Sequence, residues 1–95
     1  SGYADMITGR QAILANGTLV IDAGDERASG STGITDSSFT PVITIAADGS
    51  EKVYVEHISY SGGVWKFRVE RSVGVDQPAL NIFWKVIALK PYKEA

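Results

Sequence analysis

The segment Leu80–Leu89 constrains the fold more than any other part of the chain, because it is a strand-like run that is apolar on both faces. Side chains of a β-strand alternate between two faces. We assign Ile82, Trp84, Val86 and Ala88 to one face, and Leu80, Phe83, Ile87 and Leu89 mostly to the other, which is broken by Asn81 and Lys85. A sheet in a small antiparallel domain normally keeps one face in water. The run therefore predicts that a second molecule, most simply another copy of this chain, covers the second face.

Other runs with the two-residue period of strands are separated by turn-forming residues. They are Thr18–Asp22, Phe39–Ala46, Lys52–Tyr60 and Val64–Glu70. The last of these runs has the cleanest alternation. We predict that Trp65, Phe67 and Val69 point inward and that Lys66, Arg68 and Glu70 point outward. In Phe39–Ala46, Pro41 suits a strand start or a sheet edge, because proline cannot donate a hydrogen bond to a neighbouring strand.

Turn signals join these runs. Asn16-Gly17 is the dipeptide best suited to a tight hairpin, so we predict a turn between Ala12–Leu14 and the strand that begins at Thr18. Asp48-Gly49 and Ser61-Gly62-Gly63 predict two further turns.

The segment Ala23–Ser38 has neither period nor bulk and predicts a long surface loop, with at most a brief strand or turn near Ile34. No window has a convincing apolar stripe at helical spacing. A chain of 95 residues is long enough for one domain with one core. The pattern therefore predicts an all-β fold, an antiparallel β-sandwich of about six strands.

Composition excludes several classes of protein. The formal net charge of −2 and the scattering of nine Lys and Arg residues argue against a nucleic-acid binder. The chain has no cysteine, which excludes disulfides, thiolate zinc sites and cysteine nucleophiles. No apolar run approaches the roughly 18 residues of a membrane helix, so we expect no membrane insertion. Ser1-Gly2 has the form of a remnant of tag removal and is left out of the fold prediction.

Catalytic and metal-binding patterns are weak. His57 could form a Ser-His-Asp catalytic triad with a serine and an aspartate, but the sequence has no G-x-S-x-G motif of a nucleophile elbow. The simpler interpretation is that His57 packs or hydrogen-bonds within a strand. Asp22, Asp25 and Glu26 are close enough in sequence to offer oxygens to a divalent cation. They lack the spacing of a calcium loop, and acids in loops more often cap turns. We predict a protein that is not an enzyme and uses no metal or cofactor.

Aromatic side chains offer flat faces for the apolar side of a sugar ring. Trp65 and Trp84 lie in the middle of alternating apolar runs, so a core position is the better interpretation for both. Tyr60 lies beside the Ser61-Gly62-Gly63 turn at a strand end and is the better candidate for a ring that faces a ligand.

Three motifs occur in a recognisable order: an early strand Gly17–Gly24, then Phe39–Ile43, and a closing strand Asn81–Ala88. This order resembles the H-type lectin-like domain, which also terminates many bacteriophage tail fibres, over residues 17 to 89. The resemblance implies a six-stranded antiparallel sandwich that assembles as a homotrimer and binds carbohydrate near the seam between subunits. On this basis we predict that residues 1–16 lead in from a longer fibre protein and that residues 17–95 form the lectin-like domain.

The resemblance also bears on which residues hold the sugar. Animal members of the family use an acidic residue after the first strand, an arginine on a central strand, and an aromatic residue with a histidine before the last strand. Here the first loop offers Asp25, Glu26 and Arg27, and His57 falls near the place of the arginine. The last loop, Arg71–Ala79, lacks both the aromatic residue and the histidine, so the animal sugar specificity does not carry over.

The predicted function is that of a non-enzymatic receptor-binding tip domain of a phage tail fibre, part of the virion, which recognises bacterial surface polysaccharide as a homotrimer. Its candidate ligand-binding residues supply planar, bidentate and aromatic groups. They are Asp25, Arg27, His57, Tyr60, Arg71 and Asp76, with Gln77 beside the last. Two alternatives stay open. A purely structural trimerisation module of a virion fibre predicts no glycan binding, and a cellular carbohydrate-binding lectin domain predicts a secretion signal in the full-length gene.

Overall fold

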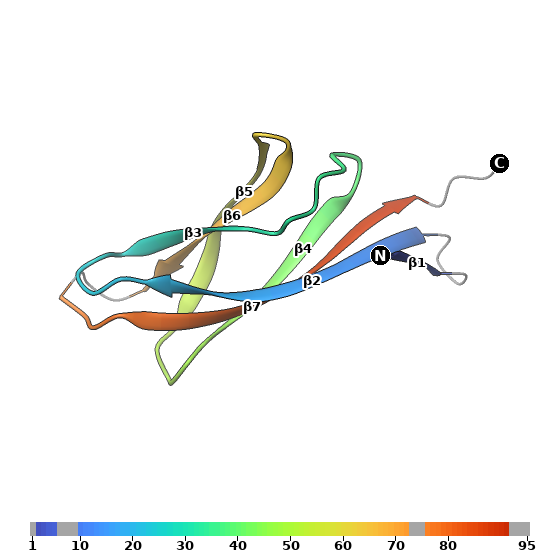
Figure 1. Cartoon of the computed structure of the whole chain (residues 1–95). Helices are drawn as coiled ribbons and strands as arrows, with labels where there is room; N and C mark the ends of the chain where they lie inside the picture. The colour runs from blue at the N-terminus through green and yellow to red at the C-terminus, as the bar shows by residue number, and fades with distance from the viewer. Residues whose placement is uncertain (1, 6–9, 73–75, 92–95) are drawn as a thin grey trace.

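The computed structural model describes residues 2–5, 10–72 and 76–91, and over these residues the protein is all-β (Figure 1). The strands are β1 (Gly2–Asp5), β2 (Arg10–Ile21), β3 (Arg27–Ser31), β4 (Thr40–Ala47), β5 (Val53–Ser61), β6 (Val64–Arg71) and β7 (Leu80–Pro91). They form two sheets, which we call the large sheet, in the order β1-β2-β7-β4, and the small sheet, in the order β3-β6-β5. Every neighbouring pair is antiparallel.

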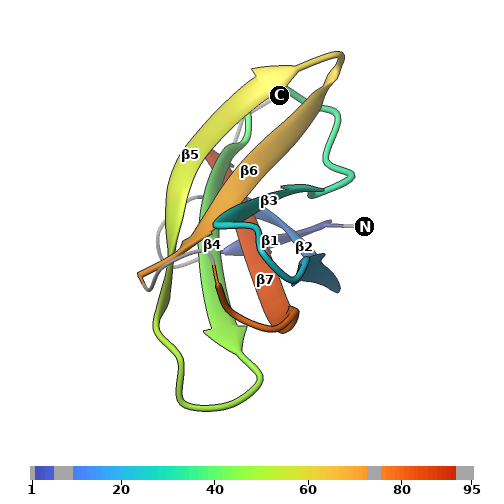
Figure 2. The same ribbon diagram turned by 90° about the vertical axis from the view of Figure 1, so that its left-hand side faces the viewer.

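The two sheets lie as two layers, and Figure 2 shows β5, β6 and β3 side by side in the small sheet. The apolar core lies between the layers and takes side chains from both. Its buried members are Ile21, Ile34, Phe39, Phe67, Val69, Leu80, Ile82, Trp84, Val86 and Ala88. The prediction of an all-β, sandwich-like antiparallel fold is confirmed. The described residues contain seven strands, against the expected six or so.

The hairpin predicted at Asn16-Gly17 is wrong, because both residues lie inside the continuous strand β2. Gly17 is the cross-strand partner of Trp84, and a Cβ built on Gly17 would lie 2.6 Å from Cζ2 of the indole. The glycine therefore makes room for a ring and does not turn the chain. The expected boundary between residues 16 and 17 falls inside β2, and β1 extends the same sheet by pairing with the first part of β2.

The segment from Ala23 to Ser38 was predicted as a long loop with at most a brief strand or turn near Ile34, but it contains the strand β3 at Arg27–Ser31. Its inward positions are Ala28 and Gly30, and a Cβ on Gly30 would lie 2.7 Å from the Phe67 ring. Only a small side chain fits beneath that ring. The strand therefore lacks the alternation of large apolar and polar residues by which a sequence indicates a strand. Ile34 is buried, and its carbonyl accepts a hydrogen bond from the Trp65 backbone N–H at 3.0 Å.

The other turns and strands agree with expectation. The Ser61-Gly62-Gly63 segment joins β5 to β6, with φ of 62° and 81° at its two glycines, a backbone conformation that side chains with a Cβ rarely adopt. In β4, which is an edge strand, Pro41 lies near the start, Ile43 and Ile45 turn toward the core, and Val42 is exposed.

The central strand β7 is apolar on both faces, as its sequence indicates, but one assignment was wrong. Leu80 is buried with Ile82 and Trp84 on the core side and does not lie on the opposite face. The outward face carries Phe83, which is 50% exposed, and Lys85, which is also exposed. The core therefore covers one face of β7, and within the described part of the chain no element covers the other.

Candidate functional site

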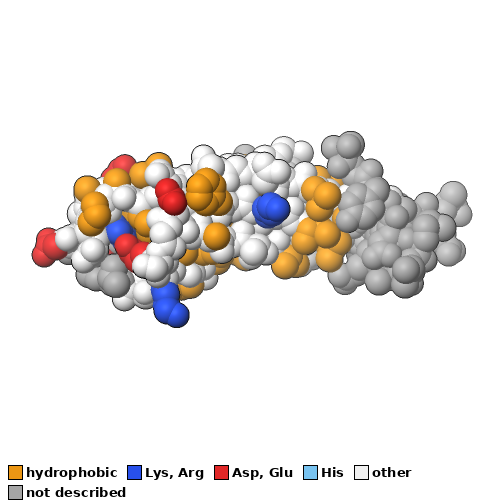
Figure 3. Space-filling model, turned by 90° about the horizontal axis from the view of Figure 1, so that it is seen from below, with side chains coloured by type: hydrophobic (Ala, Val, Ile, Leu, Met, Phe, Trp, Pro, Cys, Tyr) orange, Lys and Arg blue, Asp and Glu red, His pale blue; other side chains and the backbone are white. Residues whose placement is uncertain are grey.

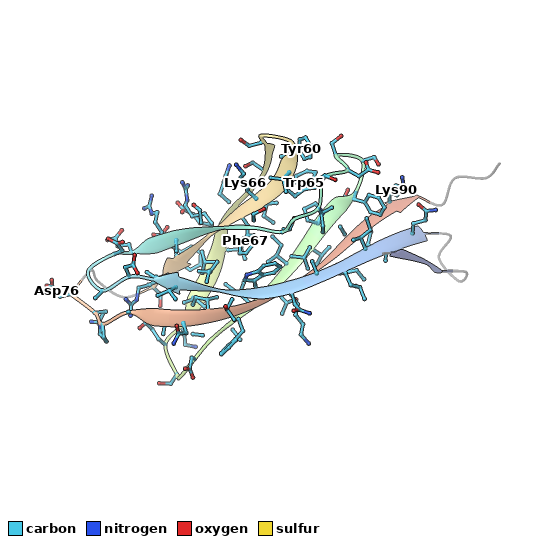
Figure 4. The ribbon with its side chains drawn as sticks, in the orientation of Figure 1. Tyr60, Trp65, Lys66, Phe67, Asp76 and Lys90 are labelled. Carbon is cyan, nitrogen blue, oxygen red and sulfur yellow. The ribbon has the colours of Figure 1, made fainter. Side chains whose placement is uncertain are left out.

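The loops that flank β2 and β7 are held together at one end of the molecule. The backbone N–H of Gly24 donates to the carbonyl of Gln77 at 3.1 Å, and that of Arg71 donates to the carbonyl of Glu26 at 2.8 Å. Asp25 and Asp76 are exposed on these adjoining segments, and Figure 4 shows Asp76 at the tip of this end. The structure thus brings the expected first-loop and last-loop acids to one end.

Arg27 opens β3 directly after this loop and lies half-exposed beside three carboxylates. Its guanidinium nitrogens are 3.8 Å from Glu26, 3.9 Å from Glu56 and 3.8 Å from Glu70. These separations are longer than charge-assisted hydrogen bonds, which measure about 2.7–2.9 Å. Arg27 is therefore attracted to this acidic surrounding without being locked to one partner.

The outward face of the small sheet continues from Arg27 as a charged surface. Arg27 pairs in register with Glu70, which pairs with Tyr54 on β5. Desolvation, followed by the neighbouring Glu70 carboxylate, raises the pKa of Tyr54, whose side chain is 46% exposed. This row joins a cation, a carboxylate and an aromatic ring.

The next row along the same face contains His57. A register shift between Val55 and His57 leaves Glu56 as an extra residue in β5, and His57 pairs with Arg68. Nε of Arg68 donates to Glu56 at 2.6 Å, and this hydrogen bond lowers the pKa of the Glu56 carboxyl. His57 is exposed and lines a shallow hollow beside Arg68.

Arg71 has a structural partnership inside the fold. Its side chain is 1% exposed, and it binds Glu51 through two hydrogen bonds of 2.6 Å each. Its third contact is Nη1 to the carbonyl of Pro78 at 2.7 Å. The hydrogen bond from Arg71 lowers the pKa of Glu51, and the same bond raises that of Arg71. The guanidinium thus ties the segment before β5 to the loop before β7 and leaves little surface for a ligand.

Tyr60 is likewise engaged with its own chain. Its hydroxyl donates to the carbonyl of Thr35 at 2.7 Å, and its ring meets Trp65 edge-on with centroids 5.4 Å apart. Figure 4 shows Tyr60 and Trp65 together at the β5–β6 hairpin, well away from Asp76. The expected residues therefore do not form one cluster: Asp25, Arg27 and Asp76 share an end, while His57 and Tyr60 lie further along the small sheet.

Both tryptophans pack within the fold, as predicted. Trp84 is 9% exposed and meets the Phe67 ring edge-on with centroids 5.3 Å apart. Trp65 packs against the core, and its indole N–H donates to the carbonyl of Asp36 at 3.2 Å. Neither ring presents an open face of the kind that a sugar needs.

The outward face of the large sheet is the main exposed apolar surface, and we call it the apolar outer face. Leu14, Val42 and the half-buried Ile87 form one cross-strand row, and Thr18, Phe83 and Ala46 form another. Leu14, Val42 and Phe83 are 56%, 51% and 50% exposed. Between the rows lies a polar row of Asn16, Lys85 and Thr44. Figure 3 shows hydrophobic side chains gathered on both sides of a basic one on the face seen from below.

On the outward face of the small sheet, sequence reasoning chose only Arg27 and His57 as candidate ligand-binding residues. Tyr54, Glu56, Lys66 and Arg68 lie on the same face. The clean alternation of β6 did predict that Lys66 and Arg68 point outward, and this was the available signal. What the alternation could not give was the pairing with β3 and β5, which surrounds these cations with small polar residues.

Within the described ranges, no group of three or more acidic, histidine or cysteine side chains is placed to hold a metal ion. Asp22 and Asp25 instead form a turn, in which the Asp25 N–H donates to the Asp22 carbonyl at 3.0 Å. The described part of the chain contains no helix long and apolar enough to cross a membrane. No protein-family model, curated protein or solved structure matches the chain.

Proposed function

We propose that this chain is a non-enzymatic receptor-binding domain at the tip of a phage tail fibre, and that it recognises bacterial surface carbohydrate as a homotrimer. The observation that supports carbohydrate recognition most directly is the end of the molecule where the loops that carry Asp25 and Asp76 adjoin and where Arg27 opens β3, which we call the joined end. The hydrogen bonds Gly24 to Gln77 and Arg71 to Glu26 fix these loops to each other. A site preorganised in this way loses less entropy when it binds a ligand.

The chemistry of this end suits sugars. Carboxylates of Asp25 and Asp76 can accept hydrogen bonds from sugar hydroxyls, and the guanidinium of Arg27 can donate to ring and hydroxyl oxygens. The half-exposed ring of Tyr54, in the same row as Arg27, offers an apolar face beside these polar groups. Polar groups around an aromatic face are the usual composition of a small-ligand site.

A single site of this kind is open and weak, so useful adhesion requires several copies. Linking binding sites makes each later contact intramolecular, which raises overall avidity by about 10² to 10⁴. A homotrimer at the end of a fibre supplies that multiplicity. The apolar outer face supports association, because a copy of the chain would remove Leu14, Val42 and Phe83 from water.

Binding of the intact chain to a glycan array tests this proposal. Arg27→Ala and Asp76→Asn should each weaken the strongest glycan signal about fivefold or more, as expected for loss of a hydrogen bond to a charged group. Ser37→Ala is the control, because Ser37 is exposed beside Asp36, whose carbonyl binds the Trp65 indole at the far part of the small sheet, away from the joined end. Unchanged binding in both site variants would contradict the proposed site. Arg71→Ala is unsuitable as a site variant, since it removes a buried structural contact.

A structural trimerisation module remains the second candidate, and the apolar outer face is the observation that favours it. The face is banded, with apolar rows on both sides of the row that contains Lys85. In a trimer with three-fold symmetry, the apolar rows of three copies can converge on the shared axis, where each copy removes the rows of its neighbours from water. An oligomer that binds no glycan on the array or on host cells would favour this second function over the first.

A further inference from the structure

The outward face of the small sheet has an unusual arrangement of cations and small polar residues. In register, Lys66 on β6 lies between Ser31 on β3 and Ser59 on β5. In the next row Arg68 lies between Ser29 and His57. Each cation on the central strand is therefore flanked on both sides by a residue that can donate a hydrogen bond.

This arrangement lines a shallow hollow of about 210 Å³. Its polar walls are Ser29, His57, Ser59, Ser61, Lys66 and Arg68. Pockets for drug-sized ligands measure roughly 300–1,000 Å³. The smaller and open hollow suits one charged group of a longer chain that lies across the sheet.

The charges on this face are separated along the strands. Glu56 and Glu70 contact Arg27 at one end, and Glu56 also holds Nε of Arg68. Lys66 lies one row further away and forms no salt bridge within the described residues. A Cβ on Gly62 would lie 3.5 Å from the Lys66 ammonium, so this nitrogen lies beside the β5–β6 turn and not beside an acid. Figure 4 shows Lys66 on this part of the small sheet.

From this geometry we infer that the hollow binds an anionic group of the receptor polysaccharide, a carboxylate or a phosphate, and that Lys66 is its principal contact. The inference rests on the proposed carbohydrate-binding function and names its ligand class. The ammonium of Lys66 has three donors, and a serine hydroxyl can rotate to donate to an anion's oxygens. Arg68 donates Nε to Glu56 and also lines the hollow, so it is a second cation beside Lys66. The chain as a whole carries a net charge of −2, so its overall charge does not attract an acidic glycan. Selection of such a glycan would come from the local positive charge of this hollow.

Direct binding of defined polymers to the intact chain tests the inference. Oligogalacturonate carries one carboxylate on each ring, and its fully methyl-esterified form keeps the rings while losing the charge. A poly(glycerol phosphate) presents phosphate in place of carboxylate, and poly(vinyl sulfonate) serves as a polyanion with neither group. We expect binding to the free acid or to the phosphate polymer, with binding to the ester and to the sulfonate at least about tenfold weaker, equivalent to about 1.4 kcal/mol.

Two matched variants assign the effect to the hollow. Lys66→Met removes the ammonium and keeps most of the aliphatic stem, and we expect it to weaken binding of the preferred polyanion about tenfold, the loss of a charge-assisted contact. Lys52→Met removes the same charge at an exposed position roughly 20 Å further along β5, and we expect little change. Both positions are exposed, so the thermal midpoint of unfolding should stay close to that of the parent chain.

The outcomes separate this inference from the proposed function. Equal binding of the acid and its ester would overturn the anionic site while leaving carbohydrate recognition intact. Equal losses from Lys66→Met and Lys52→Met, or equally tight binding of poly(vinyl sulfonate), would overturn it by showing general charge attraction. Absence of binding to both charged polymers would also overturn it. The neutral glycans of the array then decide separately whether the domain binds carbohydrate at all.

Discussion

The indole of Trp84 lies over Gly17, its cross-strand partner, where a Cβ would come within 2.6 Å of the ring. The same relationship occurs in the small sheet, where the Phe67 ring lies over its partner Gly30 at 2.7 Å from a built Cβ. The two rings meet edge-on between the sheets, with centroids 5.3 Å apart. The centre of the core therefore contains two aromatic rings in edge-on contact, each packed over a glycine of its own sheet.

Gly17→Ala should destabilise the fold by about 1–3 kcal/mol, because the added methyl group forces the Trp84 ring to move in a packed core. Equilibrium urea denaturation measures this change. Thr18→Ala, at the adjacent outward position, is the control and should have a much smaller effect. In a double-mutant cycle with Trp84→Leu, the loss from Gly17→Ala should shrink, since the clash partner is gone. Equal losses with and without the tryptophan would contradict direct contact as the cause.

Trp84→Ala should destabilise the domain by about 3–5 kcal/mol, as large truncations of buried aromatic residues do. This is a large share of the stability of a small domain, so partial or complete unfolding at ambient temperature is expected. Tyr54→Ala removes an aromatic ring from the small sheet, outside the apolar outer face, and should cost far less, because Tyr54 is 46% exposed. Circular dichroism melting curves of the two variants give the comparison. Similar melting temperatures would place Trp84 outside the core.

Glu51→Gln should lower stability at neutral pH, because it removes the carboxylate that binds Arg71. The hydrogen bond from Arg71 lowers the pKa of Glu51 in the folded protein below its ordinary value of 4.5. Its stabilising contribution is therefore complete above that ordinary pKa and disappears as the pH falls through the lower, folded-state pKa. The melting temperatures of parent and variant should converge in acid. Asp25→Asn, on the exposed loop, is the control, and a difference that stays constant into acid would contradict this linkage.

Phe83→Asp should convert an oligomer of this chain into a monomer without unfolding it. The side chain is half-exposed on the apolar outer face, so a carboxylate is tolerated by the single subunit but would be buried in an interface. Sedimentation velocity measures the change in mass, and circular dichroism checks that the fold persists. Ser29→Asp, at an exposed position on the outward face of the small sheet, is the control and should leave the assembly intact. A parent chain that is monomeric at micromolar concentration would contradict the interface and, with it, the trimeric fibre tip.

Local pattern predicted most of the strands. The alternation in Val64–Glu70 correctly gave the direction of the side chains of β6 and all of the strand except Arg71, because successive residues of a half-buried strand face opposite sides of the sheet. The same logic failed for β3, whose inward residues must be small to fit under Phe67. Because the inward residues of β3 are small, its sequence does not show the apolar alternation that predicts a strand.

The candidate site was predicted only in part. Asp25 and Asp76 were chosen separately as candidate ligand contacts, and hydrogen bonds between their loops bring them to one end. Arg71 was chosen as an exposed loop cation, yet its partner is Glu51, which lies 20 positions earlier in the chain. No local pattern marks an ion pair between such distant positions.

Residue order and type were thus enough to establish an all-β chain with a strand that is apolar on both faces, since strand periodicity is a property of neighbouring residues. The role of each special residue depended on what lies across from it. Asn16-Gly17 has the composition of a turn, and its place inside β2 follows from the ring of Trp84 on the adjacent strand. Lys66 and Arg68 are ordinary surface cations in the sequence, and pairing with β3 and β5 sets serines and a histidine around them. Such partnerships arise from the packing of distant segments, which short-range periodicity does not encode.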